Sequence, residues 1–334
     1  MRILITAPYY EKAQEILKQQ FGEIIYKPWK LQGRAYNERE LIGLLSETKA
    51  EALITEHDEV TEAVIHAFPE LRFIGVCRGT PSNVAVSIAT KKGIPVFHTP
   101  ARNAQAVAEM FIANLVNLMR NTLAGINWLE GENWEAGAHT SYLQFKGNEI
   151  AGKTIGMVGF GAVGQTIANL IRHFPTKIQY YDPFYTSHDP VYKKVSLEEL
   201  FKTCDVVSVH LPVNADTIGM IGKDLISLMK PDSIFVNTAR AVVVKREDLW
   251  FAIENNLIRG AILDVFDHEP PDELDYKLIH HENVLATPHI AGATFEVEDH
   301  HANIMNNCLH NFYVEGNQSI RQLVNKEVLS VKAS

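Results

Sequence analysis

The sequence predicts an α/β protein with two doubly wound parallel-sheet domains. Short apolar or β-branched segments alternate with amphipathic ones over about the first 100 residues, and a second alternating series runs from about residue 153 to 289. A chain of 334 residues is long enough for two domains, each with its own core. We therefore expect the two series to form two domains of similar design.

The first series contains four expected strands, RILITAP, EALITE, RFIGVC and IPVFHT, separated by helical stretches such as EKAQEILKQQF. After the second series the chain turns helical again and ends in a polar tail. We expect this last helix to return to the first domain, which would then consist of residues 1–100 and 291–334. The second domain is expected to span residues 101–290.

Two segments join the series. Residues 103–121 read NAQAVAEMFIANLVNLMRN and are apolar on more than one face. A surface helix shows a single apolar stripe, so this helix is expected to be buried between domains or subunits, with Asn103 either capping it or reaching the ligand cleft. Residues 122–150 are rich in Gly, Asn and Trp, and we expect an extended arm.

The composition excludes several classes of protein. A formal net charge of -9 argues against a general nucleic-acid or anionic-membrane binder. The three cysteines Cys77, Cys204 and Cys308 lack metal-ligand spacing. The pairs His280–His281 and His300–His301 have no cysteines or carboxylates clustered at ligand spacing, so no metal site is expected. Free thiols suit a reducing cytosol, and no signal segment or bilayer-length apolar run is evident. We expect a cytoplasmic protein.

A glycine motif opens the second series. The segment TIGMVGFGAVG places Gly159, Gly161 and Gly164 in G-x-G-x-x-G order between an expected strand and an expected helix. The first glycine permits a tight turn, the second lets backbone approach a pyrophosphate, and the third allows close helix–strand packing. The pyrophosphate would then bind amide groups near Ala162 and Val163, favoured by the helix dipole. This pattern predicts a Rossmann dinucleotide-binding domain.

An acid is expected about 20 residues after this motif, at the end of the next strand. Asp182 closes KIQYYD and has this position. Its carboxylate would accept hydrogen bonds from the adenosine ribose and repel a 2′-phosphate, and no arginine follows it at once. NAD is therefore expected rather than NADP. A tight turn followed by an unrelated surface aspartate is the alternative.

Three chemically active residues each follow an expected strand: Arg240 follows SIFVNTA, Glu269 follows AILDVFDH and His289 follows NVLATP. Ligands bind at the carboxyl ends of strands in open parallel sheets. A hydride carries no proton, so reduction of a 2-keto acid needs a proton donor, for which His289 is suited, and a cation for the carboxylate, for which Arg240 is suited. Glu269 would orient the imidazole if paired with it. Taken singly, the three residues are also compatible with a surface ion pair, a helix N-terminal acid and a satisfied strand-end histidine.

The segments NTARA, LDVFDHEPP and TPHIAGAT resemble signatures of the D-isomer-specific 2-hydroxyacid dehydrogenases, and the resemblance covers nearly the whole chain. It implies a Rossmann NAD-binding domain plus a flavodoxin-like substrate domain around a cleft, with hinges near residues 98–103 and 289–294. It also implies hydride transfer between a D-2-hydroxy acid and its 2-keto acid. In the family the arginine binds substrate, the histidine is the acid/base and the glutamate pairs with it, and these roles carry over to Arg240, His289 and Glu269.

The same resemblance implies further contacts with the cofactor. These fall to Leu211, Pro212 and Thr217 at the adenosine half, Thr238 and Ala239 at the nicotinamide, Asp264 at its carboxamide, and Arg240, His289 and Gly292 nearby. Asp264 could instead cap a turn after its strand. The resemblance also implies a homodimer joined through the cofactor domain, with the long helix and the 122–150 arm at the interface.

The loop IGVCRGTPSNV is expected to contact the substrate, because backbone amides at Arg78 and Gly79 could bind a carboxylate. This loop departs from the glycine-rich segment and Asn-x-Asp of many relatives, with Ala85 where an aspartate is common. Arg78 slightly favours a polar or phosphorylated acid, such as 3-phosphoglycerate, hydroxypyruvate or glyoxylate, or else it pairs across the domain interface. Cys77 is expected to be a packed thiol rather than a nucleophile.

Two rival functions remain from the sequence. Corepressors related to this family bind NAD and keep the arginine, glutamate and histidine, so an NAD-sensing binding protein is one alternative. Oxidation of phosphite on the same scaffold is another, because it keeps the glutamate, whereas formate dehydrogenases have glutamine where this chain has Glu269.

Overall fold

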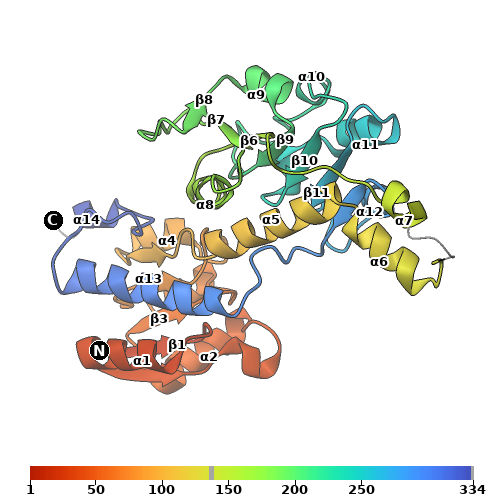
Figure 1. Ribbon diagram of the computed structural model, residues 1–334. Helices are drawn as coiled ribbons and strands as arrows, with labels where there is room; N and C mark the ends of the chain where they lie inside the picture. Colours follow the sequence, from red (N-terminus) through yellow and green to blue (C-terminus); the bar gives the residue numbers. More distant parts are fainter. Residues whose placement is uncertain (135–138, 332–334) are drawn as a thin grey trace. The chain divides into compact units, whose positions relative to one another are not determined.

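A computed structural model describes residues 1–134 and 139–331 (Figure 1). The chain divides into two compact units. Unit 1 comprises Met1–Arg102 and Thr294–Ser334, and unit 2 comprises Asn103–Ala293. The divisions fall after Arg102 and Ala293, a few residues beyond the sequence-based boundaries at 100 and 290. Each unit contains one fully parallel sheet, as the alternating pattern predicted.

Unit 1 has five strands in the order β2-β1-β3-β4-β5, which is the flavodoxin-like order. The strands are β1 (Arg2–Ile5), β2 (Glu23–Tyr26), β3 (Ala52–Thr55), β4 (Ile74–Val76) and β5 (Val96–His98). Four of the five were predicted. The prediction missed β2, a four-residue edge strand (EIIY) whose two isoleucines are only partly buried.

The helices of unit 1 are α1 (Glu11–Phe21), α2 (Glu38–Thr48), α3 (Glu62–Ala67), α4 (Val86–Lys91), α13 (Glu296–Tyr313) and α14 (Val328–Val331), with a 3-10 turn η1 (Trp29–Gln32). The long helix α13 packs on α1 and against β5 (Figure 1). The segment after it was expected to be a polar tail, but Leu323 forms an antiparallel bridge with Phe97 and the Asn325 side chain accepts a hydrogen bond from Val96 N–H at 2.8 Å. This segment therefore covers the β5 edge of the sheet.

Unit 2 has seven strands in the order β12-β11-β10-β9-β6-β7-β8, a Rossmann order with one additional strand. The strands are β6 (Thr154–Val158), β7 (Lys177–Tyr181), β8 (Tyr192–Lys194), β9 (Val206–Val209), β10 (Ile234–Asn237), β11 (Gly260–Leu263) and β12 (Val284–Ala286). Only β8 was not predicted. It is a three-residue strand at the outer edge of the sheet, with two exposed lysines and no buried residue.

The helices of unit 2 are α5 (Ala104–Met119), α6 (Thr122–Glu130), α7 (His139–Gln144), α8 (Ala162–Ile171), α9 (Leu197–Thr203), α10 (Lys223–Ile226), α11 (Arg246–Glu254) and α12 (Glu273–Ile279), with a 3-10 turn η2 (Ala241–Val243). The apolar helix α5 packs on α8 and on the ends of β11 and β12 (Figure 1). Its buried side chains Phe111, Leu115 and Met119 belong to the core on that face of the sheet.

The 122–150 segment is not simply an extended arm, because it contains α6 and α7. The stretch Thr122–Glu130 has apolar residues at i, i+3 and i+6 (Leu123, Ile126, Leu129), a spacing that favours a helix and that its Gly, Asn and Trp content concealed. Residues 135–138 of the arm lie outside the described residues. In the described part of the chain, no helix combines the length and the apolar character that crossing a bilayer requires.

Candidate active site

The glycine turn lies between β6 and α8 at the carboxyl edge of the sheet. Gly159 has φ +92°, and a Cβ there would lie 2.8 Å from the backbone oxygen of His210. A Cβ on Gly164 would lie 2.6 Å from the backbone oxygen of Gly159. At Gly161, by contrast, a Cβ would meet no described atom within 4 Å. The fold itself therefore requires glycine at 159 and 164. Gly161 instead leaves open space where a diphosphate would approach the backbone.

The start of α8 supplies donors at this open position. Gly161 is the residue before the helix and offers no side chain to cap it, and α8 has ten residues. The first amide groups of a helix, here including Ala162 and Val163, have no intrahelical acceptor and carry the positive end of the helix dipole. The residues present therefore fit the pyrophosphate of a dinucleotide.

Asp182 braces this turn. One carboxylate oxygen accepts from Phe160 N–H at 2.8 Å, and the other accepts from Phe184 and Tyr185 N–H at 2.9 and 3.0 Å. A carboxylate has about four acceptor positions, so capacity remains for a ribose hydroxyl. Asp182 is therefore tied to the glycine motif and is not an unrelated surface aspartate. The sequence did not indicate this bracing.

The loop after β9 is held by its own side chains. The Thr217 hydroxyl donates to Pro212 O at 2.7 Å and accepts from Asn214 N–H at 2.9 Å. Thr217 is buried and so shapes the loop, whereas Pro212 is exposed. Leu211 is buried beside the glycine turn, with its Cδ2 3.4 Å from where a Gly159 Cβ would lie.

His210 was not singled out from the sequence, although it stands at a strand end. Both of its ring nitrogens are buried, and neither has a hydrogen-bond partner in the part of the chain that the structure describes. Its ring carbon Cδ2 lies 3.6 Å from where a Gly164 Cβ would be. Burial lowers the pKa of His210 to about 3, so this ring is neutral near pH 7.

The buried Asn237 at the end of β10 positions the loop that carries Arg240. Its side chain accepts from Ala239 N–H and donates to Arg240 O, both at 3.0 Å. The Arg240 side chain is exposed and donates to Ala239 O at 2.6 Å, and no carboxylate among the described residues pairs with it. A surface ion pair therefore does not account for Arg240. The Thr238 hydroxyl next to it is buried and has no partner within the described residues.

Asp264 at the end of β11 positions the loop that carries His289. It is 1% exposed and accepts from Thr287 Oγ1 (2.6 Å), Ile290 N–H (2.9 Å) and Ala291 N–H (2.8 Å). These contacts hold the backbone on both sides of His289, whose φ is +53°. Asp264 therefore caps the turn that carries His289, and Oδ2, which accepts from Ala291 N–H, keeps capacity for a further donor.

Glu269 and His289 form the pair that the sequence suggested. Nδ1 of His289 lies 2.8 and 3.0 Å from the two carboxylate oxygens of Glu269, and the side chains are 45% and 47% exposed. An ionised carboxylate can only accept, so Nδ1–H donates, and Nε2 has no partner among the described residues. Glu269 is not the cap of α12, because Asp272 has that position. The arrangement can hold an imidazole in one orientation for proton exchange at Nε2.

Gly292 and Asn103 lie against each other. A Cβ on Gly292 would lie 2.5 Å from Nδ2 of Asn103, so a side chain at 292 would displace the asparagine. Asn103 precedes α5, but its side chain makes no capping hydrogen bond. Packing against Asn103 thus explains the glycine at 292. Neither role expected for Asn103, capping of the helix or reaching the ligand cleft, is seen within unit 2.

Arg78 and Gly79 belong to unit 1, whereas Arg240, Glu269 and His289 belong to unit 2. Backbone oxygens of this loop are already used: Arg78 O accepts from Thr99 N–H at 2.9 Å, and Gly79 O is 2.8 Å from Nδ1 of His98. Cys77 is fully buried, and burial raises the pKa of its thiol well above the ordinary value. It is a packed thiol, as expected, and not a nucleophile.

Comparison with known proteins bears on this arrangement. A model of the NAD-binding domain of D-isomer specific 2-hydroxyacid dehydrogenases matches residues 112–291. YoaD of Bacillus subtilis (strain 168), whose name assigns it provisionally to the 2-hydroxyacid dehydrogenases, is 55% identical over 329 residues that cover 98% of this chain and 96% of YoaD. A hydroxypyruvate reductase of Thermotoga maritima is 36% identical over 72% of this chain and 77% of its own length.

Among solved structures, a D-lactate dehydrogenase from Aquifex aeolicus, complexed with NAD and lactic acid, is 25% identical with a TM-score of 0.74. The match covers 97% of this chain and 99% of that one. These similarities do not favour the corepressor-like alternative, and they agree with the fit of the glycine turn to NAD. The chain belongs to the D-isomer-specific 2-hydroxyacid dehydrogenases, a family of NAD-dependent enzymes.

Proposed function

We propose that this protein interconverts a D-2-hydroxy acid and its 2-keto acid, with Arg240, Glu269 and His289 as the catalytic residues. The observation that carries the proposal is the pairing of His289 Nδ1 with Glu269 at 2.8 Å, which leaves Nε2 available. Arg240, with which no carboxylate of the described residues pairs, follows a strand of the same parallel sheet, at the edge where ligands bind.

The residues divide the chemistry of keto-acid reduction between them. Arg240 binds the substrate carboxylate through its guanidinium and polarises the adjacent carbonyl. His289 gives a proton from Nε2 to the carbonyl oxygen, and Glu269 stabilises the imidazolium before this transfer and holds the ring afterwards. NADH, when bound, would supply a hydride to the carbonyl carbon, and this hydride together with the proton from His289 converts C=O to CH–OH. In the reverse direction His289 takes the proton.

For the cofactor, we propose that the Ala162 and Val163 amides hold the pyrophosphate beside Gly159, Gly161 and Gly164. Asp182 would accept from the adenosine ribose with its remaining capacity. The other proposed contacts are Leu211, Pro212 and Thr217 at the adenosine half, and Thr238, Ala239, Arg240, Asp264, His289 and Gly292 at the nicotinamide half. The Thr238 hydroxyl is buried and has no hydrogen-bond partner among residues 1–134 and 139–331, which supports a polar contact there.

For the substrate, we propose that the amides of Arg78 and Gly79 bind a carboxylate and that Arg78 favours a polar or phosphorylated acid. Gly79 is exposed, and a Cβ there would meet no described atom within 4 Å, which supports access of a ligand to its backbone. Phosphoglycerate, hydroxypyruvate and glyoxylate all suit this reading.

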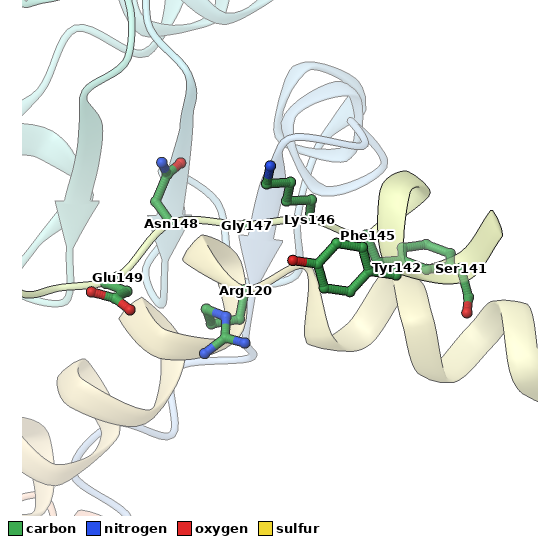
Figure 2. Close-up of a pocket in the computed structure, with 8 residues that line it drawn as sticks. All are labelled: Arg120, Ser141, Tyr142, Phe145, Lys146, Gly147, Asn148 and Glu149. Atoms are coloured by element: carbon green, nitrogen blue, oxygen red, sulfur yellow. The ribbon is translucent and has the colours of Figure 1, made fainter. Parts of the chain in front are cut away.

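We also propose a homodimer joined through unit 2. The described part of the arm carries exposed apolar side chains on and beside α6 and α7: Leu123, Ile126, Leu129, Trp134, Tyr142 and Leu143. A patch of this kind commonly marks a protein interface. Beside it, Arg120, Ser141, Tyr142 and residues 145–149 line a surface hollow of about 490 Å³, and Figure 2 shows Tyr142 and Phe145 along it. The three buried free cysteines support a reducing, cytoplasmic setting.

The test is NADH oxidation with a panel of 2-keto acids: glyoxylate, pyruvate, hydroxypyruvate and its phosphate, and longer sugar acids. We expect turnover that depends on His289 and that prefers one member of the panel. Tight NADH binding without turnover of any member would favour an NAD-sensing protein instead.

A further inference from the structure

Arg246, the first residue of α11, lies among carboxylates on both sides of Glu269 in the sequence. Its Nη1 donates to Asp272 at 2.8 Å and to Asp275 at 3.2 Å, and its Nε lies 3.3 Å from Asp267. The Arg246 side chain is 19% exposed and that of Asp275 is 2% exposed, so water screens these contacts only weakly. One guanidinium thus joins three carboxylates around the loop that carries the proposed catalytic acid.

Asp275 extends this anchoring to the backbone of the loop. Its second oxygen accepts from His268 N–H at 3.2 Å and from Asp272 N–H at 3.3 Å. Asp272 in turn caps α12 by accepting from Asp275 N–H at 2.9 Å. The residue directly before Glu269 and the residue three positions after it are therefore both fixed to the start of α12, which is fixed to Arg246.

Arg246 also accounts for a group of residues that otherwise resembles a metal site. His268, Asp272 and Asp275 offer ligand atoms within 4.8 Å of one another. Burial alone would lower the pKa of Arg246, but its hydrogen bonds to Asp272 and Asp275 outweigh burial and hold that pKa above the ordinary value. The guanidinium already supplies the positive charge that these acids need.

A small cavity links this anchor to the second catalytic loop. Arg246, Asp267, Asp275 and Asn237 are among the residues that line a space of about 20 Å³, which can hold one water molecule. Asn237 is the residue whose side chain holds the backbone at Ala239 and Arg240. The loops of Arg240 and Glu269 are thus both supported from this one region.

We propose that Arg246 is a positioning residue: it holds the Glu269 loop so that Glu269 stays on Nδ1 of His289, and it acts through Glu269 without touching substrate or cofactor. This inference rests on the proposed function of the Glu269–His289 pair. A lysine would be a poor replacement, because a single ammonium cannot span carboxylates that a planar guanidinium bridges.

The experiment compares wild-type protein with Arg246→Gln, Arg246→Lys and Asp267→Asn, using the 2-keto acid that the wild type reduces fastest. We expect Arg246→Gln to lower kcat by about 10- to 100-fold, the cost of a misplaced catalytic group, with NADH affinity changed by less than about twofold. Arg246→Lys should fall between wild type and Arg246→Gln. Asp267→Asn removes one contact only, so it keeps the test available if Arg246→Gln folds poorly.

The matched control is Glu247→Gln. Glu247 also approaches Arg246 Nε, at 3.5 Å, but its side chain is 70% exposed and lies on α11, away from the Glu269 loop in sequence. Glu247→Gln should keep the wild-type kcat. If loss of any charge near Arg246 were enough to slow the enzyme, Glu247→Gln would lower kcat as well.

The deciding measurement repeats Arg246→Gln in a Glu269→Gln background. If Arg246 acts through Glu269, the double variant is no slower than Glu269→Gln alone. A wild-type kcat for Arg246→Gln, or an equal loss in both backgrounds, would overturn the positioning role while leaving the proposed function intact. Full activity of Glu269→Gln would instead remove the proposed function, and the positioning role with it.

Discussion

An arginine near the carboxyl edge of each sheet differs from the other in its burial and in its partners. In unit 1, Arg102 is largely buried, donates to the buried Glu56 at 2.5 Å and contacts Nδ1 of His301 at 2.9 Å. In unit 2, Arg240 is exposed, and no carboxylate in the described ranges pairs with it. The charge of Arg102 is neutralised by Glu56 within the fold, whereas Arg240 remains available to a ligand. The partners of an arginine, more than its position at a strand end, indicate its role.

Histidines differ in the same way. His301 is buried, its Nε2–H donates to Pro8 O at 2.6 Å, and its Nδ1 accepts from Arg102, so both nitrogens are used. Burial lowers the pKa of His301. His289 is half-exposed and is held from one side only, by Glu269. A buried, fully bonded ring stabilises the fold, whereas a ring held at one nitrogen can exchange a proton at the other.

The largest expected effect is on the exposed histidine. His289→Ala should lower kcat for keto-acid reduction by about 10²- to 10⁴-fold, the usual contribution of a general acid. NADH affinity and the unfolding temperature should change little, because the ring is 45% exposed and makes one side-chain contact. Steady-state kinetics, NADH fluorescence titration and thermal unfolding measure the three quantities. Unimpaired turnover would refute the acid/base role.

The two arginines provide a direct comparison. Arg102→Met leaves the buried Glu56 carboxylate without its arginine partner and should cost about 3–5 kcal/mol of unfolding free energy. Arg240→Met should leave that free energy almost unchanged, since its side chain is exposed, but should raise KM and lower kcat. Denaturant unfolding and kinetics on both variants test the contrast. Equal destabilisation by the two substitutions would contradict it.

His210 predicts a dependence of stability on pH. Burial lowers the pKa of His210 to about 3, whereas an unfolded histidine has a pKa near 6.5. The unfolded chain therefore binds a proton first as pH falls. This contribution to stability is complete above about pH 6.5 and is lost toward pH 3, by up to about 1.4 kcal/mol per pH unit.

Replacing His210 with Phe removes this titration. The stability of His210→Phe relative to wild type should therefore rise as pH falls from 7 to 4, in urea unfolding at several pH values. Burial also lowers the pKa of His301, but His301 is present in both proteins, so the difference between them isolates His210. Parallel stability curves would show that the His210 ring is not held neutral.

The smallest expected effects separate two glycines of one turn. Gly164→Ala puts a Cβ 2.6 Å from the backbone oxygen of Gly159 and should cost about 1–3 kcal/mol of unfolding free energy. Gly161→Ala meets no described atom within 4 Å, so it should fold normally but bind NADH more weakly. Denaturant unfolding with NADH titration distinguishes them. Loss of stability at 161 would mean that this position serves the fold as well.

The sequence was sufficient for most of the fold. Alternating apolar segments predicted ten of the twelve strands, and the two missed ones, β2 and β8, are short edge strands without a buried face. The helices of the arm were missed because Gly, Asn and Trp obscured a weak apolar spacing. Edge and surface elements bury little apolar area, so their sequences carry little of the signal that periodicity detects.

Hydrogen-bond partners were much less accessible from sequence. Asp182 and Asp264 were expected to contact the cofactor, and their carboxylates also brace the glycine turn and the His289 loop. Only for Asp264 did the sequence suggest such a turn-capping role. Nothing in the sequence indicated a role for Arg246 or His210, because neither residue belongs to a motif or to a periodic pattern. The long-range contacts of Asp182, Asp264 and Arg246 join residues that are 21 to 29 positions apart in the chain.

By itself, then, the order of residues determined which side chains stand at the ends of parallel strands, because strand direction and the two-residue period are local properties. The order of residues also determined the glycine turn, because the backbone conformation of that turn depends on a few neighbouring residues. The tertiary structure alone decided which of those side chains bond to other parts of the protein and which remain available to a ligand. That choice depends on burial and on donors and acceptors brought together from separate loops, which no spacing within one segment encodes.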